Sequence, residues 1–206
     1  MFSKKVSRRE MLTRTGLLVS ASVLPATEVH AARRSSNTIT LNADEKQDLI
    51  FMREEEKLAR DVYLTLYDKW GTAVFASIAT SEQQHMDAIL NLLNTYKLAD
   101  PGAGKLVGEF VNPELQAHHD ALIERGSLSV LEALKVGGVI EETDIEDLTA
   151  AMGTSRLSKI DNVYSNLLDG SYNHLRAFAG KIESLTGLPY AAQVVEQEVV
   201  DRILAG

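Results

Sequence analysis

Cysteine is absent from this 206-residue sequence. Disulfide bonds, thiolate metal sites and iron–sulfur clusters are therefore excluded, and any bound metal must be held by histidine, aspartate and glutamate. Basic residues are too few to balance the acidic ones, since the formal net charge is −8, and no long basic run follows residue 34. This charge argues against a nucleic-acid surface and favours ions or small molecules as partners.

The apolar run from Gly16 to Ala26 is too short for a membrane-spanning helix. It has only about a dozen residues, whereas a helix that crosses a membrane requires roughly 20. Basic residues precede this run, and the small-residue pattern Val29-His30-Ala31 follows it. We therefore predict that residues 1–31 are an export signal, that no membrane span remains after its removal, and that the protein is periplasmic or extracellular.

The segment Ser7-Arg8-Arg9-Glu10-Met11-Leu12 resembles the twin-arginine export signal, in which paired arginines precede apolar residues. That resemblance implies export of an already folded protein. Met11 stands where the pattern usually has phenylalanine, so ordinary secretion stays open as an alternative. Residues 32–43 are interpreted as a polar leader before the folded part of the chain.

Hydrophobic periodicity predicts four long amphipathic helices. The composition, 24% charged and 45% hydrophobic, is ordinary for one soluble domain. Two connections are tight, so the helices that they join should be antiparallel neighbours. The predicted helices run from a capping pair at Asn42 and Glu45 to about Trp70, before Gly71; from about Thr72 to Tyr96; from near Ser129 to just before Gly153; and along an apolar stripe from Ile160 to Ile182.

The second and third helices are separated by a long crossover of about 30 residues. Asn112 and Pro113 predict the start of a short helix within it, which Gly126 closes. Residues 188–206 are predicted to form a short C-terminal helix or arm. The predicted fold class is therefore all-α, an antiparallel four-helix bundle of the ferritin-like topology over residues 44–187.

Each long helix carries a metal-type side chain on its apolar stripe. Glu82 and His85 have the Glu-x-x-His spacing by which one helix offers two ligands to one site. Burying a carboxylate without a partner costs several kcal/mol, and a divalent metal ion can compensate that cost. Four carboxylates and two neutral imidazoles would balance two such ions. The candidate ligands are Glu56 on the first helix, Glu82 and His85 on the second, Glu141 and Asp144 on the third, and His174 on the fourth.

Other polar residues near these stripes have different interpretations. Glu142 lies about 100° around the helix from Glu141, so it is the alternative ligand if the register is shifted by one residue. Glu54, Glu55 and Lys57 are interpreted as a solvated face with charge pairing at helical spacing.

Two further pairs of adjacent residues stand out. His118 and His119 cannot share a helix face, which favours surface or crossover packing over metal binding. Gly137 and Gly138 lower helix propensity and predict a close approach of another element.

The segment Glu56-Lys57-Leu58-Ala59-Arg60-Asp61-Val62-Tyr63 resembles the first ligand helix of rubrerythrin-type proteins, and Glu82-x-x-His85 resembles the second. Residues from about 44 to 182 are similar to a bacterial and archaeal ferritin-like family known only as a domain of unknown function. The fourth helix departs from the pattern, because Ser171 stands where a glutamate is usual, and Asp144 is the candidate replacement. The resemblance implies a di-iron or di-manganese centre with Glu56, Glu82, His85, Glu141 and His174 as ligands.

Three functions stay open from the sequence. The first is a redox-active di-metal protein, iron being favoured over manganese, that oxidises ferrous iron or reduces peroxide or dioxygen. Because no cysteine-rich electron-transfer domain is present, peroxide reduction would need an external electron donor. The second is metal binding or storage without turnover, and the third is a structural bundle with a decayed site, which Ser171 favours. A homodimer is compatible with the sequence, which does not fix the oligomeric state.

Overall fold

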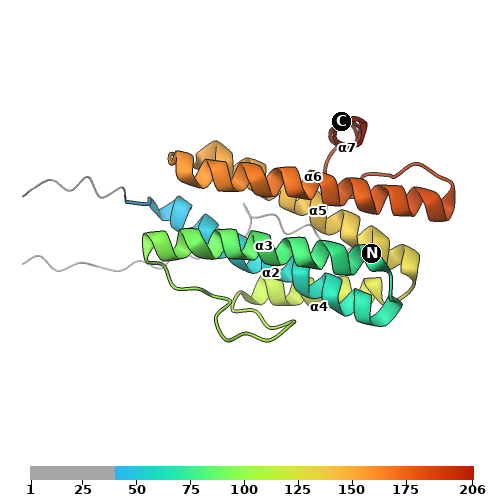
Figure 1. The fold of residues 1–206 in the computed structure, drawn as a ribbon, viewed down its shortest axis with the longest axis horizontal. Helices are drawn as coiled ribbons and strands as arrows, with labels where there is room; N and C mark the ends of the chain where they lie inside the picture. Colours follow the sequence, from blue (N-terminus) through green and yellow to red (C-terminus); the bar gives the residue numbers. More distant parts are fainter. Residues whose placement is uncertain (1–39) are drawn as a thin grey trace, which may run out of the picture.

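The computed structural model describes residues 40–206, so the predicted export signal, residues 1–31, lies outside the described residues, as do residues 32–39 of the leader. Within residues 40–206 all regular secondary structure is helical. Four long helices form a bundle, and a shorter helix lies against it (Figure 1). The helices are α2 (Ala43–Trp70), α3 (Ala73–Tyr96), α4 (Pro113–Gly126), α5 (Val130–Thr154), α6 (Ser158–Thr186) and α7 (Gln197–Ala205).

The ends of α2 follow from its capping residues. The Asn42 side chain accepts a hydrogen bond from the Glu45 backbone N–H, and the Glu45 carboxylate accepts one from the Asn42 N–H, both at 2.7 Å. Gly71 ends the helix in the left-handed conformation, with φ of 63°. The predicted caps are confirmed. Only Gly71 and Thr72 separate α2 from α3, so the two helices run antiparallel side by side (Figure 1).

The helix α5 begins as predicted and ends later than predicted. The Ser129 hydroxyl accepts a hydrogen bond from the Glu132 N–H at 3.1 Å and caps the helix. The predicted end before Gly153 is wrong, because α5 continues through Gly153 to Thr154. Gly153 does not have the positive φ of a left-handed cap, and the Ser155 N–H still donates to the Ala151 carbonyl.

Two adjacent glycines allow neighbouring elements to approach α5 closely. A Cβ atom on Gly137 would lie 2.5 Å from the ring of Phe178 in α6. A Cβ atom on Gly138 would lie 2.1 Å from the hydroxyl of Tyr190, which belongs to the segment after α6. The predicted close approach at these glycines is therefore confirmed.

Charged residues of α2 hold the crossover, and this overturns one interpretation of the sequence. Glu54, Glu55 and Lys57 were expected on a solvated face, but each is less than a tenth exposed. The Glu54 carboxylate accepts hydrogen bonds from the N–H groups of Val111 and Asn112. The Lys57 ammonium donates to the Leu106 carbonyl and to Asp61. The crossover covers this face of α2, so the charges of Glu54 and Lys57 are buried and paired.

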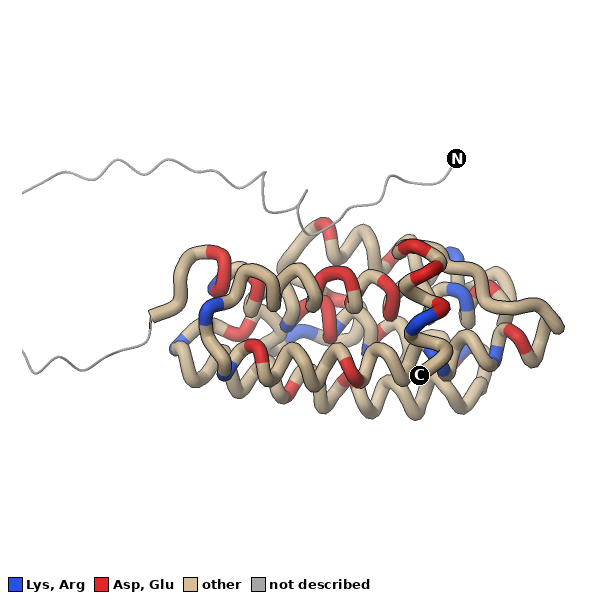
Figure 2. The backbone as a smooth tube through the Cα atoms, turned by 90° about the horizontal axis from the view of Figure 1, so that it is seen from above, with Lys and Arg blue, Asp and Glu red and all other residues tan. Residues whose placement is uncertain are grey.

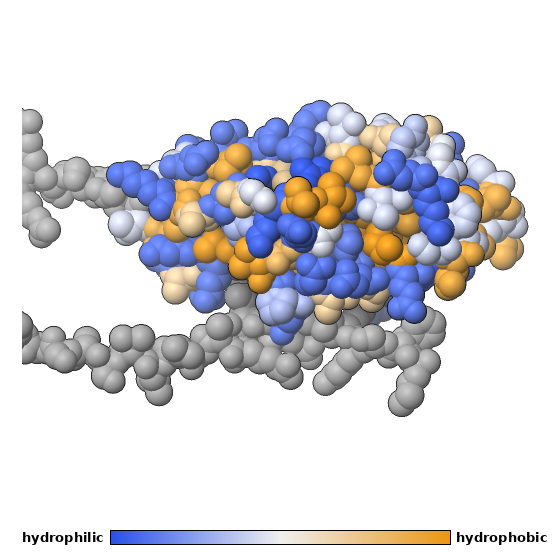
Figure 3. All heavy atoms as spheres, turned by 90° about the horizontal axis from the view of Figure 1, so that it is seen from below, coloured by the Kyte–Doolittle hydropathy of each residue, from blue (hydrophilic) through white to orange (hydrophobic). Residues whose placement is uncertain are grey.

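No helix within residues 40–206 is long and apolar enough to cross a membrane. Acidic residues outnumber basic ones along the helices (Figure 2). On the face drawn in Figure 3, apolar residues are interspersed with polar ones. The unusual polar residues of the described part of the chain are therefore the buried ones.

Candidate metal centre

The structure brings together five of the six predicted ligands in the middle of the bundle. They form two groups, Glu56 with Glu82 and His85, and Glu82 with Glu141 and His174. In each group the three ligand atoms lie within 4.8 Å of one another, and all the residues are buried. Since Glu82 belongs to both groups, it joins them into one centre with contributions from α2, α3, α5 and α6.

The carboxylate of Glu82 lies between two imidazoles. Its Oε2 atom is 2.8 Å from His85 Nδ1, and its Oε1 atom is 2.8 Å from His174 Nδ1. Glu56 Oε2 approaches His85 Nδ1 at 3.2 Å, and Glu141 Oε2 approaches His174 Nδ1 at 3.3 Å. Each histidine nitrogen thus faces the shared carboxylate and one carboxylate of its own group. Glu82 could therefore offer one oxygen atom to a cation in each group.

The two imidazole rings stack across the centre. Their centroids are 5.4 Å apart with an interplanar angle of 29°. A glycine of α6 makes room for one of them, because a Cβ atom on Gly170 would lie 2.5 Å from His85 Nε2. The role of Gly170 cannot be recognised in the sequence, since it depends on a neighbouring helix.

Two hydroxyl groups orient the ligands from behind. The Tyr63 hydroxyl donates to Glu141 Oε1, and burial raises the pKa of Tyr63, so the hydroxyl keeps its proton. Ser81 Oγ lies 2.9 Å from His174 Nε2 and forms a hydrogen bond with it. Such partners fix the direction of a ligand and are typical of metal sites.

Asp144, the sixth predicted ligand, lies beside the centre but belongs to neither group. Its Oδ2 atom accepts a hydrogen bond from Ser171, and its Oδ1 atom has no hydrogen-bond partner. Burial raises the pKa of Asp144 well above its ordinary value, and the nearby carboxylate of Glu56 raises it further. Ser171, at the position where the resemblance implies a glutamate, is thus directly linked to Asp144, the candidate replacement carboxylate.

Protons on the histidines compensate the buried carboxylates when no cation is present. Burial alone would lower the pKa of His85, but its bonds to Glu56 and Glu82 raise it to about 11. Burial would also lower the pKa of His174, but the neighbouring carboxylates of Glu141 and Glu82 raise it to about 10. Burial raises the pKa of Glu56 to about 7 despite its bond to His85.

The donor set fits divalent cations, as three orphaned or poorly aligned atoms indicate. Glu56 Oε1 and Asp144 Oδ1 are buried without a hydrogen-bond partner. His174 Nδ1 lies near two carboxylates but is not aligned for a hydrogen bond with either. Buried polar atoms normally have hydrogen-bond partners. Atoms that lack one are suited to a bound cation, which accepts lone pairs from several directions. Imidazole nitrogen and carboxylate oxygen donors suit several divalent transition metals, iron and manganese among them.

Glu142, the alternative ligand, has a different role. It is fully buried, and its carboxylate accepts hydrogen bonds from the Tyr190 hydroxyl at 2.6 Å and from three successive backbone N–H groups. Those N–H groups belong to Gln193, Val194 and Val195. Glu142 therefore anchors the C-terminal segment before α7 and does not take part in either group of ligands.

The two crossover histidines also lie outside these groups. The His119 ring packs against Phe110 at 5.3 Å between centroids and close to Gly108, so it supports the crossover. His118 lines a small cavity together with Glu55. Glu55 was expected on a solvated face, but it is a buried acidic residue. Its position beside the cavity could not be predicted from the spacing of charges along α2.

Comparisons with known proteins agree on one uncharacterised family. A family model described as "Uncharacterized protein domain (DUF2202)" matches residues 45–206. The chain is 44% identical over 165 residues to the uncharacterized protein MJ0754 of Methanocaldococcus jannaschii, covering 80% of this chain and 89% of that relative. It is also similar to the crystal structure of the hypothetical protein MJ0754, with a TM-score of 0.78 and 41% identity over 90% of this chain and 98% of that one.

Proposed function

The chain belongs to the family of the uncharacterized protein domain DUF2202, and we propose that it binds two divalent transition metal ions in the middle of its bundle. The observation that carries this proposal is the position of Glu82, whose two oxygens face His85 and His174. One metal would be held by Glu56, Glu82 and His85, and the other by Glu82, Glu141 and His174. Asp144 supplies the fourth negative charge that balances two divalent cations.

The ferritin-like interpretation is part of this proposal. Two tight helix pairs, α2 with α3 and α5 with α6, are joined by a long crossover that contains α4. Ligands from all four long helices meet in the bundle interior, as in di-metal carboxylate bundles. These features support a di-iron carboxylate centre, with manganese as the alternative metal.

Redox turnover with peroxide or dioxygen is the activity that we propose for this centre. When bound, two ferrous ions would supply one electron each for the reduction of one hydrogen peroxide with two protons to two water molecules, and an external donor would have to return both electrons. The chain itself buries the site, holds Glu141 through Tyr63, and holds His174 through Ser81. These contacts keep the ligands in place while the charge of the site changes.

The experiment is elemental analysis of the purified mature protein beside a Glu82→Gln variant. Glutamine keeps the shape of glutamate and removes the charge, so both metals should be lost while the helix content by circular dichroism is retained. Glu146→Gln, an exposed position on α5, is the matched control and should keep about two metals per chain. Full metal occupancy in Glu82→Gln would refute the centre.

Peroxide or dioxygen consumption by the iron-loaded protein separates redox turnover from metal storage. Ser171 favours a third candidate, a structural bundle in which the His–Glu pairs only stabilise the interior, because a carboxylate expected from the resemblance is missing. The absence of bound metal in the wild-type protein would support that candidate.

We also propose that the protein is exported, with residues 1–31 as the signal.

A further inference from the structure

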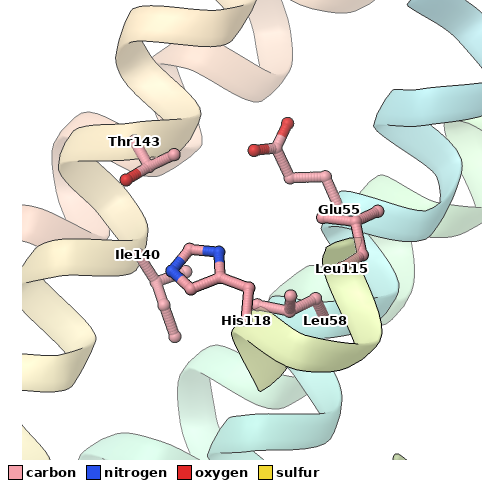
Figure 4. A pocket seen from close by; sticks show the side chains of 6 residues that line it. All are labelled: Glu55, Leu58, Leu115, His118, Ile140 and Thr143. Carbon is pink, nitrogen blue, oxygen red and sulfur yellow. The ribbon is translucent and has the colours of Figure 1, made fainter. Parts of the chain in front are cut away.

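A small cavity lies between α2, α4 and α5, on the side of the bundle where α4 packs. Its volume is about 10 Å³, which is the space of about one water molecule. Figure 4 shows the carboxylate of Glu55 and the imidazole of His118 facing this space from different helices. The lining residues are Glu55, Leu58, Leu115, His118, Ile140 and Thr143.

The cavity is lined by half-buried residues and by buried ones. His118 and Thr143 are half-buried, whereas the other lining residues, Glu55 among them, are buried. Glu55 is 7% exposed, and its Oε2 atom has no hydrogen-bond partner. The next residue in the chain is Glu56, a ligand of the proposed centre.

Two further buried carboxylates extend this acidic path on α5. Asp144 and Asp147 are one helical turn apart, and both are less than a tenth exposed. The Glu55 side chain is in hydrogen-bond contact with Asp147 and lies close enough to Asp144 to feel its charge, and burial together with both neighbours raises the pKa of Glu55 well above its ordinary value. Asp144 Oδ1, like Glu55 Oε2, is without a hydrogen-bond partner.

These acidic residues do not form a closed third site. Among residues 40–206, only the two groups that share Glu82 bring three ligand atoms within 4.8 Å of one another. A path for ions needs attraction strong enough to draw the ion in and weak enough to let it leave. Carboxylates that attract a cation without enclosing it meet both conditions, and they compensate the water that an ion loses in a narrow cavity.

We propose that Glu55, Asp147 and Asp144, with His118 at the outer end, form the route by which a divalent transition metal ion enters the centre. The ion passes from the half-buried imidazole to Glu55 and the α5 carboxylates, and from Asp144 to the ligands. This inference rests on the proposed metal centre and adds the side from which that centre is loaded.

The test is the rate of Co²⁺ uptake by the metal-free mature protein, followed by stopped-flow absorbance, together with the final Co²⁺ content per chain. Glu55→Gln keeps the size of the side chain and removes its charge, so the uptake rate should fall at least about tenfold while the final content is unchanged. His118→Leu suits the apolar neighbours of the cavity and should also slow uptake. Glu146→Gln, exposed on the same helix as Asp147, should load at the wild-type rate.

Three outcomes would overturn the route. Uptake at the wild-type rate in Glu55→Gln means that the ion enters elsewhere. If Glu55→Gln binds less Co²⁺ at equilibrium but takes up the Co²⁺ that it does bind at the wild-type rate, Glu55 belongs to the centre and not to a path that leads to it. A wild-type protein that binds no Co²⁺ at equilibrium would refute the centre itself, and the route with it. A wild-type protein with a full Co²⁺ content, beside a Glu55→Gln variant that takes up Co²⁺ at the same rate, would refute the route alone.

Discussion

Gly170 of α6 lies directly against the ring of His85 of α3, so that a Cβ atom on Gly170 would come within 2.5 Å of His85 Nε2. No side-chain contact is this short, so a larger residue must displace the imidazole. Because the opposite ring nitrogen faces Glu56 and Glu82, the position of the candidate ligand depends on the absence of a side chain on another helix.

Gly170→Ala should therefore weaken the metal site that contains His85 and spare the other. The expected result is a loss of about one metal per chain in elemental analysis. Gly180→Ala is the matched control, because Gly180 lies on the same helix with nothing within 4 Å of the added methyl group. That control should keep its metal and gain roughly 0.5–1 kcal/mol in stability from better helix propensity. Equal metal content in the two variants would contradict this account of Gly170.

Metal binding should release protons and become tighter as pH rises. In the metal-free protein the pKa values of His85 and His174 are raised to about 11 and about 10, so both imidazoles carry a proton at neutral pH. Metal ions bind unprotonated nitrogen, so loading must displace those protons. We expect release of at least about two protons per chain at neutral pH, one for each ion, and an affinity for each ion that rises at least about tenfold per pH unit. An indicator dye in weak buffer measures the release, and an affinity independent of pH would contradict the prediction.

Helical periodicity was sufficient to single out polar residues that the structure brings together in the bundle interior, because Glu56, Glu82 and His174 interrupt apolar stripes that local spacing reveals. The roles of Glu54 and Lys57 could not be predicted in this way. Their partners lie on the crossover, between 49 and 58 residues away, so the face looks solvated until that segment is placed. Gly170 has the same difficulty, since only the packing of α3 on α6 shows what its missing side chain permits.

Glu142→Ala should destabilise the protein without changing its metal content. The substitution leaves the N–H groups of Gln193, Val194 and Val195 without their shared acceptor and removes the bond from Tyr190. Loss of several hydrogen bonds to one buried charge should cost about 3 kcal/mol or more in the free energy of unfolding. Chemical denaturation measures this cost, and Glu146→Ala on the exposed side of α5 is the control. Loss of metal from Glu142→Ala in a folded protein would show that the register assigned to α5 is wrong.

Export should depend on the paired arginines of the predicted signal. Arg8→Lys with Arg9→Lys preserves both charges and removes the guanidinium groups, whose donor geometry differs from that of ammonium. If the twin-arginine interpretation is right, the full-length precursor should accumulate in the cytoplasm of the expressing cell. Fractionation followed by immunoblotting measures its distribution. Undiminished export of the double variant would instead indicate ordinary secretion.

The contact between Ser171 and Asp144 gives the sharpest test of the charge balance in the centre. Asp144→Ser removes one of four carboxylates, so two divalent cations are no longer neutralised and one metal should be held more weakly. Ser171→Ala keeps the carboxylate but removes its hydrogen-bond donor, so it should retain both metals and lose about 1–3 kcal/mol of stability.

Exchanging the two residues, Asp144→Ser with Ser171→Asp, returns a carboxylate to the same contact from the opposite helix. The exchanged protein should recover the metal that Asp144→Ser loses, because charge and total side-chain volume are both restored. Metal content of the four proteins, measured side by side, decides the question. If Asp144→Ser keeps two metals, then Asp144 contributes no charge to the centre. If the exchange fails to restore a lost metal in a folded protein, the position of the carboxylate matters and not only its charge.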